Sequence, residues 1–186
     1  MPFDTMALVE SQLLAPGTAL IPFKLKDISG KPVSSVDFNS NLLLVVFTCN
    51  HCPYAIASWP ILVELQNKYA SKGYQTVAIN PNNNPNYPDD SFEKMKPFAE
   101  KNGISFPYLF DETQDVARAY GATCTPDPYL FKEGKLFYHG RITDNWQKPE
   151  LVKERSLELH ILAGLGEGRA SEKAIPSMGC SIKWVS

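Results

Sequence analysis

Two of the four cysteines stand three residues apart, in the segment Cys49-Asn50-His51-Cys52. A Cys-x-x-Cys pair serves dithiol–disulfide chemistry, holds a metal ion, or is simply two buried apolar residues. The redox use needs a thiolate, so the surroundings must lower the pKa of a thiol. We therefore expect the chemistry of this chain to be decided by what lies around Cys49 and Cys52.

The residues on either side of the pair predict a strand before it and a helix after it. Leu42 to Phe47 is a continuous apolar run, typical of a strand buried on both faces of a sheet. Pro53 suits the first turn of a helix, which should run to about Ala70 with a kink near Pro60. The junction of a central strand and a helix N-terminus is a common place for an active site.

This position gives the pair a reason to be redox-active. A helix N-terminus carries unpaired N–H groups and a partial positive charge, which stabilise a thiolate. We expect Cys49 to be the more exposed cysteine and the nucleophile, and Cys52 to resolve the mixed disulfide. His51 should favour the thiolate further. Because a stabilised reduced form makes a disulfide more oxidising, we predict a stronger oxidant than a thioredoxin-type pair.

The rest of the chain alternates strands and helices, which predicts an α/β sandwich with a mixed sheet. We expect one domain over residues 1–164 and a tail, 165–186, that packs on it and has no clear element. The asparagine-rich run 80–90 is interpreted as a long loop, in which Asn82–Asn84 are expected to be solvated. The other expected elements are a hairpin at 23–36, a strand at 74–79, a helix opened by Asp90 and Glu93, a strand at 106–110, a helix at 112–120, a hairpin at 128–141 and a helix at 150–163.

Composition narrows the class of protein. The 186 residues carry 18 Lys+Arg and 20 Asp+Glu, a formal net charge of −2, which gives no support to a nucleic-acid or anionic-membrane binder. Four cysteines are too few for a disulfide scaffold. The apolar runs are too short for a membrane span, and the N-terminus lacks the basic region of a signal peptide. We expect a soluble, cytoplasmic protein.

Several segments resemble the thioredoxin fold and, more closely, the peroxiredoxin-like members of the alkyl hydroperoxide reductase/thiol-specific antioxidant (AhpC/TSA, redoxin) superfamily. The matching segments are the turn at 27–30, FTCNHCPY at 47–54, FPYLFDETQDVARAYGATCTPD at 106–127, YHGRI at 138–142 and GCSIKW at 179–184. The resemblance implies a thioredoxin-like α/β/α sandwich with a central mixed sheet, an N-terminal hairpin and a C-terminal extension.

The resemblance also implies roles for two residues outside the pair. Pro126 should follow a cis peptide bond and face the cysteines, and Thr125 should offer backbone groups to the substrate. The chain departs from true peroxiredoxins, which have a Thr three residues and a Pro seven residues before the peroxidatic cysteine; aligned on Cys52, these positions hold Cys49 and Val45. Arg141 is the nearest candidate for a peroxide-binding arginine.

Three further residues are candidates for accessory roles. Cys124 either approaches the pair or is a buried thiol. Cys180, in a tail expected to be mobile and exposed, either folds back to resolve Cys49 or packs beside Ile182 and Trp184. Asp127 could accept a proton from Cys52 during exchange.

Four functions are compatible with these residues. The first is a thiol–disulfide oxidoreductase without a cofactor, acting on protein or small-molecule disulfides or a partner redoxin. The second is an atypical thiol peroxidase, with Cys180 or a cysteine of the motif resolving a sulfenic acid. The third is a thiolate metal-binding protein using Cys49 and Cys52 with Cys124 or His51, and the fourth is a redox-inactive scaffold. The first is favoured, and relatives suggest a homodimer.

Overall fold

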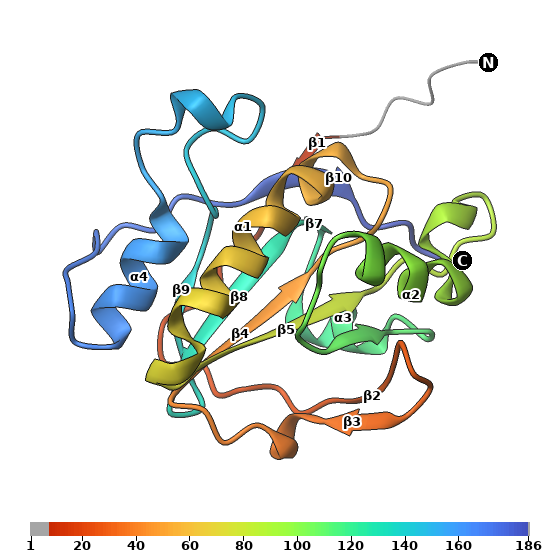
Figure 1. The fold of residues 1–186 in the computed structure, drawn as a ribbon, viewed down its shortest axis with the longest axis horizontal. Helices are drawn as coiled ribbons and strands as arrows, with labels where there is room; N and C mark the ends of the chain where they lie inside the picture. The colour runs from red at the N-terminus through yellow and green to blue at the C-terminus, as the bar shows by residue number, and fades with distance from the viewer. Residues whose placement is uncertain (1–7, 186) are drawn as a thin grey trace.

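A seven-stranded mixed sheet forms the centre of the computed structural model, which describes residues 8–185 (Figure 1). The strands follow the order β3-β2-β6-β5-β4-β8-β9; β4, β5 and β6 are parallel to one another and the other neighbours are antiparallel. Their bounds are β2 Lys24–Asp27, β3 Pro32–Ser34, β4 Leu42–Phe47, β5 Tyr74–Asn80, β6 Tyr108–Phe110, β8 Asp127–Lys132 and β9 Lys135–His139. The two predicted hairpins, β2–β3 and β8–β9, are confirmed.

Helices cover both faces of this sheet, as the predicted sandwich requires. Alternate residues of β4 point to opposite faces, because successive side chains of a strand do. Leu42, Leu44 and Val46 pack with α1, α2 and α4, whereas the residues between them pack with α3. The bounds are α1 Pro53–Tyr69, α2 Phe92–Lys101, α3 Asp115–Tyr120 and α4 Ser156–Gly164, with 3-10 turns at Ser35–Asp37, Ala70–Lys72, Pro88–Asp90 and Pro149–Leu151.

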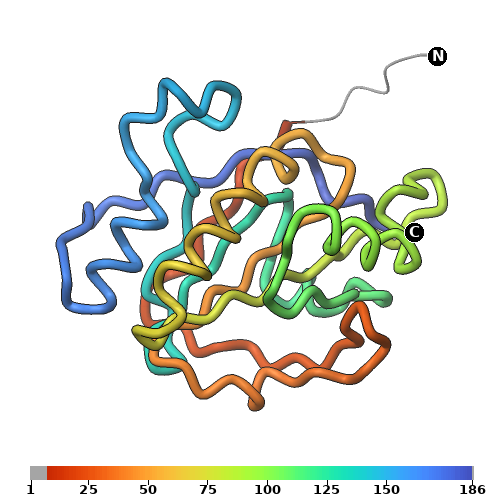
Figure 2. Tube along the Cα trace, viewed as in Figure 1, coloured from red at the N-terminus to blue at the C-terminus, as the bar shows by residue number. Residues whose placement is uncertain are grey.

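A second, three-stranded sheet lies at the start of α1 and was not predicted. It consists of β1 (Leu8–Glu10), β10 (Met178–Ser181) and β7 (Cys124–Thr125), in the antiparallel order β1-β10-β7. The expectation that residues 164–186 contain no element is therefore wrong. Figure 2 shows this C-terminal segment passing the beginning of α1 beside the N-terminal strand. The division of the chain at residue 164 stays a prediction.

Two helix predictions need correction. The predicted helix at 150–163 is a 3-10 turn followed by the shorter α4. The helix expected to open with an Asp90–Glu93 capping pair begins at Phe92, with Ser91 at the N-cap and no side-chain cap. Asp90 is fully buried and bonds elsewhere, as described below.

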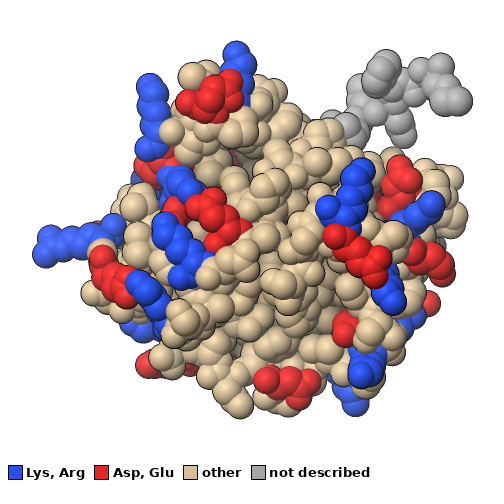
Figure 3. Space-filling model, viewed as in Figure 1, with Lys and Arg blue, Asp and Glu red and all other residues tan. Residues whose placement is uncertain are grey.

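The surface charges agree with the small net charge. On the face shown in Figure 3, acidic and basic side chains are interspersed, and neither sign forms a continuous field. Within residues 8–185 there is no helix of the length and apolar character that crossing a membrane would require.

Replacing Gly179 by alanine tests how closely β10 must approach β7. The added Cβ would lie 2.0 Å from the carbonyl oxygen of Thr125, and both groups are fixed to backbone, so β10 must move. We expect the free energy of unfolding, measured with urea, to fall by about 1–3 kcal/mol, the usual cost of overpacking. Gly168→Ala is the control, because the nearest atom to its Cβ would be Leu162 Cβ at 3.3 Å. Equal losses in both variants would contradict the close approach.

Candidate active site

The Cys-x-x-Cys pair lies in the loop that joins β4 to α1, where the sequence predicted it. Cys52 is the N-cap of α1 and Pro53 its first residue. Both cysteines are fully buried, at 0% relative exposure. The expectation that Cys49 is the more exposed of the two is therefore wrong, because β10 and the segment 80–90 pack over this loop.

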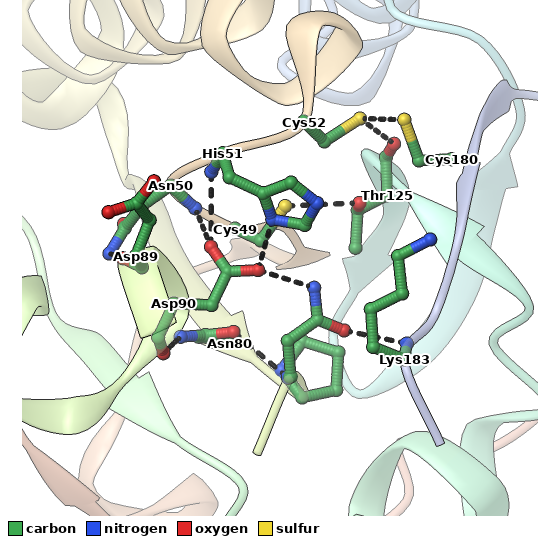
Figure 4. Close-up of polar contacts among 12 residues, drawn as sticks. Cys49, Asn50, His51, Cys52, Asn80, Asp89, Asp90, Thr125, Cys180 and Lys183 are labelled. Carbon is green, nitrogen blue, oxygen red and sulfur yellow. Dashed lines mark hydrogen bonds and ion pairs between the residues drawn. The ribbon is translucent and has the colours of Figure 1, made fainter. Parts of the chain in front are cut away.

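Thr125 lies between the two cysteines (Figure 4). Its Oγ1 is 3.4 Å from Cys49 Sγ, and its carbonyl oxygen is 3.4 Å from Cys52 Sγ. The Thr125–Pro126 peptide bond is cis, as the family resemblance implied. The backbone that precedes Pro126 thus faces the sulfur pair.

Asp90 organises the same loop, and the sequence analysis missed it. Its Oδ1 accepts hydrogen bonds from the backbone N–H groups of Asn50 at 2.7 Å and His51 at 3.0 Å. Its Oδ2 contacts Nδ1 of His51 and accepts from Asn82 Nδ2 at 2.7 Å. A buried carboxylate with every neighbour a donor holds the backbone of the motif in one conformation.

The asparagine-rich run is a loop with a 3-10 turn at its end, so the predicted loop is confirmed, but it is not solvated along its whole length. Asn80, Asn82 and Asp90 are all buried. Asn80 Nδ2 donates to the Asp90 carbonyl at 2.7 Å, which fixes the turn between them. One signal was present in the sequence: these residues follow β5, which is parallel to β4, and the carboxyl ends of parallel strands meet at one edge of a sheet.

His51 is half-buried and its pKa is raised. Burial of the ring opposes this shift, but the hydrogen bond and the charge of Asp90 outweigh it. With Nδ1 occupied by Asp90, the remaining ring nitrogen, Nε2, has no hydrogen-bond partner within the described residues. A nitrogen of the same ring lies within 4.8 Å of the Cys49 sulfur.

The two thiols of the motif differ in acidity. Hydrogen bonds from Cys180 and Cys49 lower the pKa of Cys52 despite its burial, with help from the backbone N–H of Ala55 at the helix start. Burial raises the pKa of Cys49, and its hydrogen bond to Cys52 raises it further. The surroundings therefore favour a thiolate at Cys52 more than at Cys49, whereas the sequence analysis assigned the nucleophile to Cys49.

Cys180 is buried in a strand, so of the two predicted alternatives the exposed tail cysteine is wrong. It lies in β10 with 1% relative exposure, and its Sγ is 2.6 Å from the Sγ of Cys52. The partner that the sequence analysis gave it was Cys49. The reason for the difference is the pairing of Cys180 with Thr125, which fixes the strand over the start of α1.

The structure does not bring the other three candidates to the sulfurs. Cys124 is a buried thiol whose Sγ is 4.0 Å from the Pro126 carbonyl. Asp127 accepts from His139 Nε2 at 2.8 Å and from the Tyr129 hydroxyl at 2.9 Å. Within residues 8–185, the hydrogen-bond and ion-pair partners of the Arg141 side chain are Ser156 and Glu154. The side chains of Asp127 and Arg141 therefore satisfy the hydrogen bonds of neighbouring polar groups in the fold.

An apolar hollow of about 170 Å³ adjoins the cis proline. Pro126 and Tyr54 line it on the side of the active site, and Trp146 packs against Tyr54 with ring centroids 3.7 Å apart and ring planes inclined by 33°. Arg141 and Met178 also belong to its wall. The hollow could receive an apolar side chain of a molecule bound beside Pro126.

The structure also groups three side chains that a metal ion could use. Donor atoms of Cys49, His51 and Asp90 lie within 4.8 Å of one another. The sequence analysis grouped Cys49 with Cys52 and either Cys124 or His51, so only two of those candidates recur. Three protein ligands with an open position are typical of catalytic zinc sites, although here Asp90 already holds the His51 ring.

The His51–Asp90 pair predicts a pH dependence. Because the folded pKa of His51 is raised, the pair stabilises the fold fully below the ordinary value of 6.5 and loses that contribution as pH rises through the folded pKa. Asp90→Asn should lower the His51 pKa in an NMR titration, and the stability difference between wild type and variant should narrow above about pH 6.5. Asp89→Asn is the control, because that residue offers its carbonyl, not its carboxylate, to Asn50. An unchanged His51 titration in Asp90→Asn would contradict this assignment.

Comparison with known proteins agrees with the fold and with redox chemistry. An uncharacterized conserved protein from Geobacillus kaustophilus is 41% identical, with a TM-score of 0.90 over 96% of this chain and 97% of that one. A putative thiol:disulfide interchange protein DsbE from Chlorobium tepidum is 25% identical, with a TM-score of 0.66 over 83% and 100% of the chains. The thiol-disulfide oxidoreductase ResA of Halalkalibacterium halodurans is 25% identical over 72% of this chain and 69% of its own length.

The family model gives the assignment. The model of the AhpC/TSA family matches residues 16–139, which include the Cys-x-x-Cys motif, the Asp90 segment and the cis proline. The predicted superfamily, the thioredoxin-like fold and the class of redox enzyme are thereby confirmed. The chain belongs to the AhpC/TSA family.

Proposed function

We propose that this protein catalyses thiol–disulfide exchange between its Cys49–Cys52 pair and disulfides of a protein or small-molecule partner. The observation that carries the proposal is the position of the two sulfurs on either side of Thr125, beside the cis proline. Because β10 already pairs with Thr125 and both sulfurs are buried, a partner's extended chain would displace β10 to bring its own sulfur to this pair. Thiol-disulfide oxidoreductases among the relatives support the same reaction.

The unequal acidity of the two thiols suggests how the exchange begins. Cys49 attacks one sulfur of the partner's disulfide, and its proton passes to Cys52. The partner's other sulfur leaves as a thiolate. Cys52 then attacks Cys49 Sγ, which releases the partner's second sulfur, and that sulfur takes the proton from Cys52. Two electrons have moved from the dithiol to the partner.

His51 is placed to assist the leaving sulfur. Its raised pKa keeps a larger fraction protonated near neutral pH, and its Nε2 is not committed to another group within the described residues. A protonated ring favours a thiolate nearby. Asp90 holds the ring orientation through Nδ1 and is therefore a positioning residue.

The peroxidase alternative receives less support from the site. The threonine and proline that precede a peroxidatic cysteine are replaced, and the Arg141 side chain is engaged by Ser156 and Glu154. Sulfenic acid formation at Cys49 or Cys52 within seconds of adding hydrogen peroxide would favour it. Cytoplasmic location, an antioxidant role and a homodimer remain predictions from the sequence.

Single-cysteine variants test the order of attack. With a dithiol reductant and an insulin substrate, Cys49→Ser and Cys52→Ser should each lose at least about 100-fold in turnover, because each removes a covalent step. Only Cys52→Ser should accumulate a mixed disulfide, detected by mass spectrometry. Cys124→Ala serves as the control with turnover near wild type. Trapping in Cys49→Ser instead would reverse the assigned order, and full turnover in both variants would remove the proposed function.

The apolar hollow should contribute to partner binding. Trp146→Ala removes one of its aromatic rings, so we expect the KM for a protein disulfide to rise about 10-fold, equivalent to about 1.4 kcal/mol. The kcat, and the kcat/KM for a small disulfide such as hydroxyethyl disulfide, should stay close to wild type. Trp184→Ala is a matched aromatic control outside the hollow. A KM unchanged by Trp146→Ala would assign the hollow no part in recognition.

A further inference from the structure

Cys52 is in contact with two other cysteines. A buried cluster contains Cys49, Cys52, Ala55 and Cys180, with Tyr54 packed against it. The Sγ atoms of Cys52 and Cys180 are 2.6 Å apart, and Thr125 contacts both Cys49 Sγ and Cys52 Sγ at 3.4 Å. Figure 4 shows the Cys52 and Cys180 sulfurs facing each other above Thr125. Cys52 therefore lies in one cluster with both other cysteines.

The backbone holds Cys180 in this place. In β10 it pairs with Leu8 of β1 on one side and with Thr125 of β7 on the other. The preceding residue, Gly179, has no Cβ, and one there would lie 2.0 Å from the Thr125 carbonyl oxygen. The strand carrying Cys180 thus rests directly on the residue that separates Cys49 from Cys52.

The local charges suit a thiol that reacts after Cys52 is oxidised. In the reduced site, the hydrogen bond to Cys52 is the main cause of the raised pKa of Cys180, ahead of burial. Once Cys52 is in a disulfide, it no longer carries the thiolate that accepts this hydrogen bond. The charge of Lys183, which lowers the pKa of Cys180, remains. Oxidation of the pair therefore makes Cys180 easier to deprotonate.

We propose that Cys180 is a third redox cysteine, which displaces Cys49 from the Cys49–Cys52 disulfide to form a Cys52–Cys180 disulfide. The proposal rests on the proposed function, which supplies the first disulfide. The Cys180 thiolate attacks Cys52 Sγ, the Cys49–Cys52 bond breaks, and Cys49 leaves as a thiolate that takes up the proton lost by Cys180. No external oxidant is needed, because one S–S bond replaces another. The exchange returns Cys49 to the reduced state while the protein stays oxidised.

Disulfide mapping of the full chain tests this step. The protein is equilibrated in graded glutathione buffers, quenched in acid, alkylated and digested with trypsin without reduction. Cys49 and Cys52 share the peptide 27–68, Cys180 lies in 174–183 and Cys124 in 119–132. We expect at least a tenth of the oxidised wild type to contain 27–68 linked to 174–183, with one alkylated cysteine that fragmentation assigns to Cys49.

Variants separate this proposal from the proposed function. Cys49→Ser should still form the Cys52–Cys180 link, Cys180→Ser should form only Cys49–Cys52, and Cys124→Ala should match wild type. Gly179→Ala keeps all cysteines but displaces β10, so its yield of the link should fall at least about fivefold. Circular dichroism confirms that each variant is folded.

Two results would overturn the proposal. One is a folded Cys49→Ser protein in which Cys52 and Cys180 stay fully alkylated across the titration. The other is a wild-type link below a tenth of the oxidised protein. Both leave the proposed function standing if Cys180→Ser still forms Cys49–Cys52, whereas the loss of Cys49–Cys52 in that variant would reject the proposed function itself.

Discussion

A buried carboxylate is the constraint on which the geometry of this site depends. Removing a charge from water costs several kcal/mol unless hydrogen-bond donors surround it. Asp90 obtains its donors from the loop before α1, through Asn50 and His51, and from Asn82 after β5. Neither segment can relax without leaving the charge unsatisfied. The conformation of the Cys-x-x-Cys loop and that of the polar run 80–90 therefore determine each other.

The two sheets meet at Thr125, and this contact decides where the sulfurs lie. In the large sheet, β4 ends just before the Cys-x-x-Cys motif, and β8 begins directly after Pro126. In the small sheet β10 crosses the same threonine through Gly179. The strands β4, β8 and β10 are held around Thr125 by backbone pairing. The positions of Cys49, Cys52 and Cys180 therefore depend on this pairing more than on the packing of their own side chains. A residue near the C-terminus thus belongs to a site that local sequence places at residues 49–52.

Patterns within one segment allowed most of the fold to be predicted, whereas the site required contacts between segments. The apolar run Leu42–Phe47 and Pro53 identified the strand and helix that carry the pair, because periodicity and helix-start preferences are local. Asp90 looked like a helix cap and Cys180 like a tail residue, because His51 lies 39 residues from Asp90 and Cys52 lies 128 residues from Cys180. Even the burial of Cys49 follows from strands that are distant in sequence. The cis Thr125–Pro126 bond came from family resemblance and from no rule about these residues alone.

The fluorescence of Trp59 can report on the conformation of the Cys-x-x-Cys loop, because this side chain is hydrogen-bonded to it. Its indole N–H donates to the carbonyl of Cys49 at 3.1 Å, and its ring packs against Tyr108. A conformational change at Cys49 therefore alters the surroundings of this ring. Trp146 lies instead at the hollow beside Tyr54. Of the three tryptophans in the chain, Trp59 therefore lies beside the Cys-x-x-Cys loop and Trp146 beside the hollow proposed to bind a partner.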